Sequence, residues 1–211
     1  MRIYLNHVSK ILRKTTVVDD VSLSFESGVI TGIKGINGSG KTMLMRLISG
    51  LIRPSEGEIW IEEKKLGVDI SFPESIGVLI ENPAFIDNLN AFDNLKLLAD
   101  LNCRIGDEEI LNILKEVSLD TAMNKKYKHF SLGMKQRLGI AAAIMEHPDI
   151  ILLDEPTNAL DSAGVDMIKR MLICERNRGA VIILSCHDYE VLRELSDEIY
   201  EMSEGKILGK V

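Results

Sequence analysis

Eight consecutive residues near the N-terminus constrain this chain more than any other feature. Residues 35–42 read G-I-N-G-S-G-K-T, which matches the phosphate-binding pattern G-x-x-x-x-G-K-[ST]. The glycines allow the backbone to curl, so that successive N–H groups point inward and form a nest for an anion. Lys41 can reach the β- and γ-phosphates of a nucleotide, and the Thr42 hydroxyl can bind Mg²⁺. The predicted nucleotide contacts are Gly35, Asn37, Gly38, Ser39, Gly40, Lys41, Thr42 and the backbone N–H of Met43.

The segments on either side of this loop agree with it. Residues 29–33 are apolar and β-branched, which is typical of a buried strand. Residues 43–48 suit a helix whose N-terminus faces the phosphates. Because strand, loop and helix agree, a glycine-rich loop without nucleotide is the weaker interpretation.

The composition argues against several other classes of protein. The formal net charge is −7, which disfavours a bare nucleic-acid binder but leaves room for a local basic patch. No apolar run approaches the ~20 residues that span a bilayer, and the first residues are too polar for a signal peptide. Cys103, Cys174 and Cys186 are odd in number and lack the spacing of metal ligands. We therefore expect a reduced, cytoplasmic chain in which Cys186 is a buried structural thiol.

Hydrophobic periodicity predicts an α/β fold. Residues 2–34 are β-rich, and residues 91–118 read as two helices, with Asp107 predicted to cap the second. Helices and apolar strands then alternate toward the C-terminus, as in a parallel α/β sheet. We expect one unit over residues 1–211, with an N-terminal β portion and a helical insert at about 88–145.

Two carboxylates directly follow a strongly apolar strand at 150–153. In parallel α/β folds the ligand lies beyond the carboxyl ends of the strands. Asp154 fits a residue that holds Mg²⁺ directly or through water. Glu155 fits the base that polarises the attacking water. A pair of exposed loop acids is the weaker alternative, because four aliphatic residues precede the pair.

A predicted helix precedes the strand at 150–153, and the residues at the start of that helix form a further motif. Ser131 is a good N-cap, and Gly133 allows close approach of another backbone. Four motifs therefore stand in a fixed order along the chain: G-I-N-G-S-G-K-T at 35–42, F-S-L-G-M-K-Q-R at 130–137, I-I-L-L-D-E-P-T-N-A-L-D at 150–161 and L-S-C-H-D at 184–188.

This ordered series resembles the ATP-binding subunit of an ATP-binding-cassette (ABC) transporter, over roughly residues 2–210. The resemblance implies an ATPase that uses ATP and Mg²⁺, with a P-loop NTPase (RecA-like) α/β core, an antiparallel β subdomain and a helical signature subdomain. In this family two cassettes pair head to tail, so Ser131, Gly133 and their helix N-terminus would contact the γ-phosphate held by a second copy. Asp161 matches a loop that crosses the dimer interface, and His187 matches a histidine that contacts the γ-phosphate. A lone histidine is more often structural, but a predicted strand delivers this one to the same edge as the carboxylates.

Several positions depart from the commonest family pattern. Glu81 replaces the usual glutamine of the loop that senses the γ-phosphate and Mg²⁺, and its carboxylate can still bind the metal or water. Glu81 with the following N-P-A-F, and the signature S-L-G-M-K-Q-R, resemble the bacitracin-resistance and lantibiotic-immunity branch of exporters. Leu12 stands where an aromatic residue normally stacks on adenine, so aliphatic packing is expected there, with Tyr4 as the aromatic alternative. Met43 replaces a frequent second hydroxyl residue.

The resemblance also implies partners. An integral membrane permease would be a separate chain, and a second copy of this chain would complete a homodimer on ATP binding, at the inner face of the cell membrane. The permease is expected to dock on residues 82–95, through Phe85, Ile86, Leu89 and Phe92, with ordinary packing of the helical insert as the alternative. The branch resemblance points to export of a peptide antibiotic or similar amphiphile.

Two other functions compete with this one. A soluble ABC ATPase acting on ribosomes or nucleic acid would usually carry two cassettes in one chain, a coiled-coil insert or zinc cysteines, and the acidic charge disfavours nucleic acid as a partner. A degenerate regulatory nucleotide-binding module is disfavoured by the intact Lys41, Asp154, Glu155 and His187.

Overall fold

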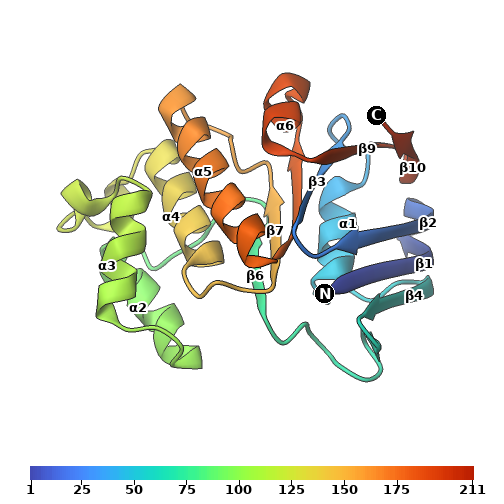
Figure 1. Ribbon diagram of the computed structural model, residues 1–211, viewed down its shortest axis with the longest axis horizontal. Helices are drawn as coiled ribbons and strands as arrows, with labels where there is room; N and C mark the ends of the chain where they lie inside the picture. The colour runs from blue at the N-terminus through green and yellow to red at the C-terminus, as the bar shows by residue number, and fades with distance from the viewer.

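The computed structural model describes residues 1–211 and contains two β-sheets. The larger sheet is formed by β3 (Val29–Lys34), β6 (Ile76–Leu79), β7 (Ile150–Asp154), β8 (Val181–Cys186), β9 (Glu198–Ser203) and β10 (Lys206–Lys210). Its order is β10-β9-β3-β8-β7-β6, and all neighbours pair in parallel except β10 with β9 (Figure 1). The predicted parallel α/β core is confirmed. The carboxyl ends of β3, β7 and β8 therefore meet at one edge of the sheet.

The smaller sheet is antiparallel, in the order β2-β1-β4-β5. Its long central hairpin turns at Arg13 and Lys14, whose φ angles of 47° and 71° suit a tight two-residue turn. The predicted N-terminal antiparallel β subdomain is confirmed. The strands are β1 (Arg2–Leu12), β2 (Thr15–Glu26), β4 (Glu56–Ile61) and β5 (Lys64–Lys65).

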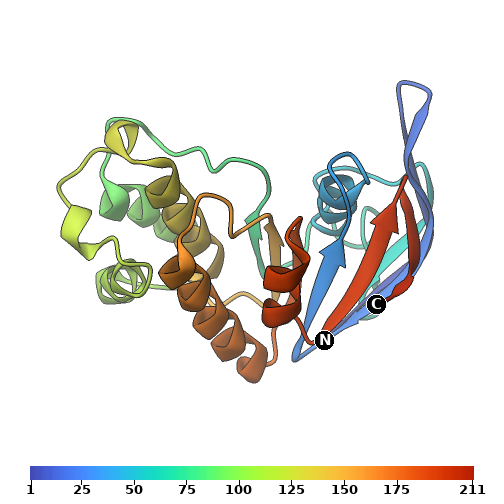
Figure 2. The same cartoon turned by 90° about the horizontal axis from the view of Figure 1, so that it is seen from above.

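The helices lie on both faces of the six-stranded sheet. They are α1 (Lys41–Ile48), α2 (Ala91–Asn102), α3 (Asp107–Glu116), α4 (Leu132–Ile144), α5 (Ser162–Arg178) and α6 (Tyr189–Leu195). Figure 2 shows α2, α3 and α4 grouped at one end of the molecule, with the antiparallel sheet at the opposite end. No helix combines the length and the apolar composition needed to span a bilayer.

The start of α3 differs from the prediction. Gly106, and not Asp107, is the N-cap, and its N–H donates to Glu109 Oε2 at 3.0 Å. Asp107 is instead the first helical residue, where a carboxylate favours the positive end of the helix dipole. It also pairs with Lys96 Nζ at 2.7 Å, which ties α3 to α2. The helix start is thus held by the Glu109 carboxylate on the Gly106 N–H, and the Asp107 side chain does not act as the cap.

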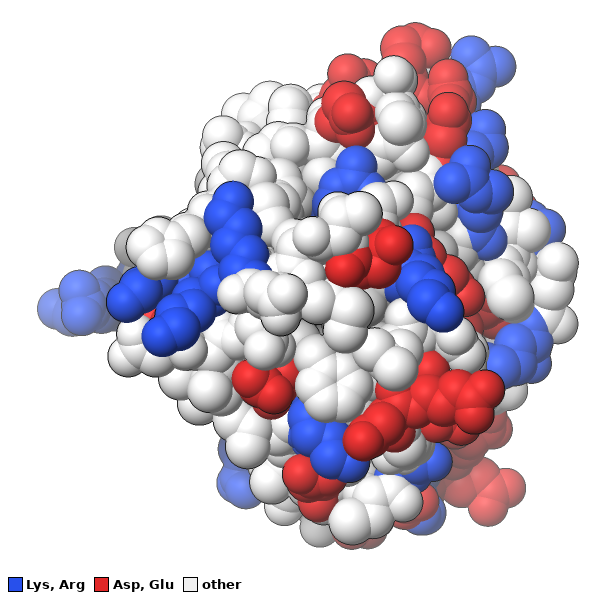
Figure 3. All heavy atoms as spheres, turned by 90° about the vertical axis from the view of Figure 1, so that its left-hand side faces the viewer, with Lys and Arg blue, Asp and Glu red and all other residues white.

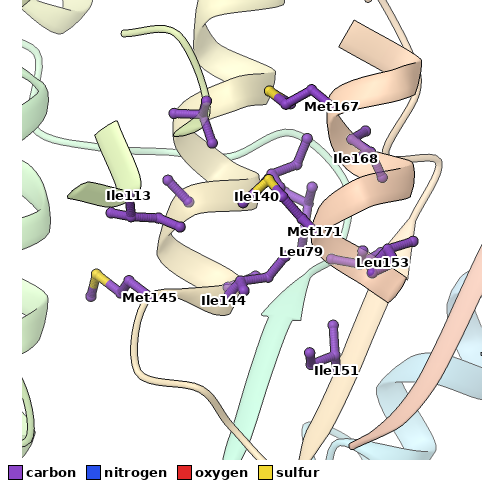
Figure 4. Close-up of a cluster of buried hydrophobic side chains, with 14 of the residues drawn as sticks. Leu79, Ile113, Ile140, Ile144, Met145, Ile151, Leu153, Met167, Ile168 and Met171 are labelled. Atoms are coloured by element: carbon purple, nitrogen blue, oxygen red, sulfur yellow. The ribbon is translucent and has the colours of Figure 1, made fainter. Parts of the chain in front are cut away.

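Each face of the six-stranded sheet belongs to a different hydrophobic core. Side chains alternate along β7, so Ile151 and Leu153 pack with α2 to α6, whereas Ile150 and Leu152 pack with α1 and the antiparallel sheet. Figure 4 shows the first of these cores, where Leu79, Ile140, Ile144 and Met171 join strand and helix side chains. Helix α1 is thereby held between the two sheets.

Gly77 in β6 provides a sharp test of this packing. A Cβ at this position would lie 1.7 Å from the carbonyl oxygen of Ala143 in α4. Because that atom is backbone, Gly77→Ala must push α4 away from β6. We expect a loss of unfolding free energy at or above the upper end of the ~1–3 kcal/mol typical of overpacking, measured by chemical denaturation.

The matched control is Gly106→Ala, whose added Cβ meets only Glu109 Oε2, at 3.4 Å. This variant should lose less than about 1 kcal/mol, the cost of a poorer N-cap. Equal stability of the two variants would contradict the close packing of α4 on β6.

Candidate active site

The loop between β3 and α1 presents backbone N–H groups at the start of a helix. Gly40 is the N-cap of α1, with φ of 112°, a conformation that strongly favours glycine. A Cβ on Gly40 would also lie 2.7 Å from the Val17 carbonyl oxygen. The first N–H groups of α1, from Lys41 to Met43, precede the first helical hydrogen bond, from Leu44 N to Gly40 O, so they lack helical partners and are able to bind an anion.

Lys41 is buried and lies across this loop. Its Nζ donates to the carbonyl oxygens of Gly35 at 2.6 Å and Ile36 at 3.2 Å. The same ammonium group is 3.9 Å from Glu155 Oε1. The positive charge therefore lies between the loop and the carboxylate, where it can attract a phosphate group.

Thr42 and Asp154 meet in space although 112 residues separate them. The Thr42 hydroxyl donates to Asp154 Oδ2 at 2.5 Å. Asp154 is buried, and its other oxygen accepts a hydrogen bond from Ser185 Oγ at 2.6 Å. Ser185 lies within the motif L-S-C-H-D at 184–188, but no role was predicted for its side chain. The threonine hydroxyl and the aspartate carboxylate form a set of hard oxygen donors.

Glu155 leaves β7 in a strained conformation, with φ of 52°. Its Oε2 accepts hydrogen bonds from the His187 backbone N–H at 3.1 Å and, in the appropriate tautomer, from His187 Nδ1 at 2.9 Å. Its Oε1 is buried and has no hydrogen-bond partner. One carboxylate oxygen is thus held by His187, while the other is free to accept a proton.

These groups line one pocket, formed by Val17, residues 37–43, Asp154 and Glu155. Ser39 Oγ, in the same pocket, is buried without a partner. Leu12 is not in this lining: it ends β1 at the hairpin turn and is exposed, as is Tyr4. Val17, which the sequence analysis did not select, is the aliphatic residue at the rim, and a role of Leu12 at the base stays a prediction.

The signature segment begins α4 but lies outside this pocket. Ser131 is the N-cap, and its Oγ accepts a hydrogen bond from the Met134 N–H at 3.3 Å. Gly133 packs so closely that a Cβ would lie 2.8 Å from the Ala159 carbonyl oxygen. The amide of Gln136, also missed from the sequence, donates to the backbone oxygens of Glu155 and Pro156, both at 3.1 Å. The signature helix is therefore coupled to the carboxylate pair through the backbone.

Asp161 and Glu81 both have partners within the chain. Asp161 caps α5 by accepting from the Gly164 N–H at 3.0 Å, and it lies 3.3 Å from the guanidinium of Arg137 in α4. Glu81 pairs with the Arg46 guanidinium of α1 at 2.8 Å and does not line the phosphate pocket. The proposed metal-binding role of Glu81 therefore stays a prediction, and in this conformation Arg46 holds its carboxylate.

The model of the family described as "ABC transporter" matches residues 18–158, which is more than half of the chain. The chain belongs to the ABC transporter family. The resemblance found in the four sequence motifs is thus confirmed, and the chain is an ATP-binding, ATP-hydrolysing subunit of this family.

Curated relatives agree with this assignment. YybJ, an uncharacterized ABC transporter ATP-binding protein of Bacillus subtilis strain 168, is 48% identical over 95% of this chain and 92% of its own length. BcrA, the bacitracin transport ATP-binding protein of Enterococcus faecalis, is 35% identical over 97% of this chain and 67% of its own length. SrtF, the lantibiotic transport ATP-binding protein of Streptococcus pyogenes, is 33% identical over 97% of this chain and 88% of its own length. The resemblance to the bacitracin and lantibiotic branch is confirmed, and the soluble alternative is not favoured.

Solved structures support the fold of this ABC subunit. The ATP-binding cassette MJ0796, in a dimeric post-hydrolysis state bound to ADP and phosphate, superposes with a TM-score of 0.88 at 26% identity. The match covers 99% of this chain and 97% of that one. Nucleotide binding thus fits both the family and the fold.

The segment at 82–95 of this ABC subunit has both apolar packing and exposed surface. Phe85 contacts Tyr127 edge to face at 5.4 Å between ring centroids, and it packs with Phe92 against the helical core. The Tyr127 hydroxyl donates to the Pro83 carbonyl oxygen at 2.5 Å, and burial raises the pKa of this tyrosine. Ile86, by contrast, is exposed. Of the four apolar residues expected to dock a permease, Ile86 is exposed, whereas Phe85, Leu89 and Phe92 are partly buried. Docking on this segment stays a prediction.

Proposed function

We propose that this chain hydrolyses ATP in the pocket between its phosphate loop and Asp154, and that it drives a separate membrane permease. The contact that carries the first part is the pair of Thr42 Oγ1 and Asp154 Oδ2 at 2.5 Å, beside the loop of free N–H groups. Lys41 and the N-terminus of α1 would bind the β- and γ-phosphates.

The residues present fit a magnesium ion. Thr42 and Asp154 offer oxygen ligands, which Mg²⁺ prefers, and two buried atoms of this pocket, Ser39 Oγ and Glu155 Oε1, lack hydrogen-bond partners. Thr42 and Asp154 would hold the ion, and Glu81 would join them if it left Arg46. When bound, Mg²⁺ neutralises charge on the β- and γ-phosphate oxygens.

Glu155 is proposed as the base for the attacking water. The water oxygen forms the new bond to the γ-phosphorus while the bond from that phosphorus to the ADP oxygen breaks, and the proton of the water passes to Glu155. Its Oε1 is the oxygen without a partner, whereas Oε2 is held by two donors of His187. His187 thus orients the carboxylate, and its exposed ring can also turn toward a γ-phosphate.

The signature residues are proposed to act in a second copy of the chain. Ser131 Oγ accepts from the Met134 N–H, which leaves the hydroxyl proton free to donate to a phosphate oxygen. Neither Ser131 nor Gly133 lines the pocket of its own chain, so head-to-tail pairing on ATP binding would complete two sites, with Asp161 near the interface. The dimeric state of the related MJ0796 cassette supports this pairing.

The partner is proposed to be an integral membrane permease that places this ATPase on the cytoplasmic face of the membrane. The names of BcrA and SrtF, which give bacitracin and lantibiotic transport, support a peptide antibiotic or a similar amphiphile as the cargo, and we propose export as the direction. Figure 3 shows one face of the molecule where positive, negative and uncharged side chains are interspersed, which suits a protein partner better than a nucleic-acid backbone.

Purification from gently solubilised native membranes tests the partner. The tagged chain should carry with it a stoichiometric polytopic membrane protein, identified by mass spectrometry. Ile86→Asp should remove that protein, because it puts a charge on the exposed large hydrophobic residue of 82–95. The control Val68→Asp changes an apolar residue on another loop that is even more exposed than Ile86, and it should keep the partner. Ribosomal proteins or a DNA-repair complex in its place would contradict the permease proposal.

A further inference from the structure

Three side chains of different chemistry converge where β7 and β8 end. A carboxylate oxygen of Glu155, the thiol of Cys186 and a ring nitrogen of His187 all lie within 4.8 Å of one another. Two of these residues are the proposed base and its orienting histidine. The third, Cys186, has no part in the proposed hydrolysis and packs in the helical core.

The donor set differs from that of the proposed magnesium site. Magnesium takes oxygen ligands almost exclusively, whereas thiolate, imidazole and carboxylate together are typical of zinc. Because the three atoms lie within 4.8 Å of one another, an ion could lie about 2.8 Å or less from each of them. Metal–ligand distances in zinc sites are shorter, about 2.0–2.3 Å. Closing that difference requires movement of the His187 ring, which is exposed, and of the Glu155 carboxylate.

The different burial of the three side chains indicates the side from which an ion can reach them. Cys186 is fully buried and forms the floor, Glu155 is partly buried, and His187 is exposed, so an ion can enter from the histidine side. Glu155 also has spare capacity for a ligand, because its Oε1 is buried without a hydrogen-bond partner, with the Lys41 ammonium 3.9 Å away. The Cys186 thiol contacts Thr157 Oγ1 at 3.4 Å and also has a hydrogen bond with the backbone of Asp188. Three protein ligands would leave the fourth zinc position to water.

We propose that Glu155, Cys186 and His187 form an inhibitory site for Zn²⁺. Zinc bound there withdraws the carboxylate from the water and the imidazole from the phosphate, so ATP hydrolysis stops while ATP stays bound. The inhibition rests on the proposed roles of Glu155 and His187, whereas the metal site itself rests only on the geometry.

Titration of buffered free Zn²⁺ into the purified chain with saturating Mg²⁺ and ATP tests the inhibition. Turnover of the wild type should fall at least about tenfold and recover on addition of a chelator. Cys186→Ser should keep basal turnover and raise the half-inhibiting zinc concentration about 10-fold or more, because one of three ligands is lost. Cys103→Ser and Cys174→Ser remove exposed thiols and should leave zinc sensitivity unchanged.

Cadmium gives a readout that does not depend on turnover. One equivalent of Cd²⁺ should produce the ultraviolet absorption of a cadmium–thiolate bond in the wild type and in both exposed-cysteine variants, and Cys186→Ser should abolish it. Wild-type turnover that ignores zinc, or equal inhibition of Cys186→Ser, would overturn the inhibition. If the wild type had no ATPase activity even in the absence of zinc, while the cadmium band was intact, the proposed hydrolytic roles would be overturned and the metal site would stand.

Discussion

Replacing Glu155 by glutamine should stop ATP turnover and leave ATP binding intact. The amide has the shape of the carboxylate, and its oxygen can still accept from the His187 backbone N–H, but it cannot take a proton from water. We expect kcat to fall by about 10²–10⁴-fold, the usual contribution of a positioned base. Phosphate release measures turnover, and equilibrium binding of a fluorescent ATP analogue measures affinity.

The same variant should also stabilise the dimer. Because ATP persists between the two copies, Glu155→Gln should elute as a dimer with Mg²⁺ and ATP and as a monomer without them, by size exclusion with light scattering. Glu116→Gln, in the exposed part of α3, is the control and should keep wild-type kcat. Unchanged turnover in Glu155→Gln would remove Glu155 from the role of base.

The parts of the site that the sequence predicts are those encoded by contiguous residues. The phosphate loop and the Asp154–Glu155 pair each occupy one short segment, so residue type and neighbouring strands are sufficient to identify them. The contacts between segments could not be read in this way. Ser185 reaches Asp154 because β7 and β8 pair in parallel with these two residues opposite each other, and that register belongs to the fold.

The contacts of Glu81 and Gln136 also join distant segments, and for that reason the sequence did not predict them. The sequence gives Glu81 a metal-binding residue type, but only the packing of α1 brings Arg46 within 2.8 Å of its carboxylate. Gln136 looked like an ordinary helix residue, although its amide holds two backbone oxygens at the end of β7. At Asp107 the local signal itself was ambiguous, because Gly106 and Asp107 both suit an N-cap. Local patterns thus predicted the elements, whereas long-range pairing determined which side chains meet.

Mixing two inactive variants should restore ATPase activity if the sites are shared between copies. Lys41→Ala removes the buried cation of the phosphate loop, and we expect a loss of turnover of about 100-fold or more. Ser131→Asp keeps a good N-cap for α4 but replaces the hydroxyl donor by a negative charge facing phosphate, so a similar loss is expected. Ser131→Asn, which keeps the cap without the charge, should lose much less and shows that α4 is intact.

A mixed dimer of these two variants has one site that combines the intact phosphate loop of one copy with the intact signature helix of the other. Random pairing makes about half of the dimers mixed, so turnover should recover to about one quarter of wild type if the two sites work independently. Differential tags and a pull-down in ATP report how many mixed dimers form. Mixed dimers without any recovery would mean that Lys41 and Ser131 serve the same nucleotide from one chain. That result would contradict the head-to-tail arrangement, because the signature helix lies outside the phosphate pocket of its own copy.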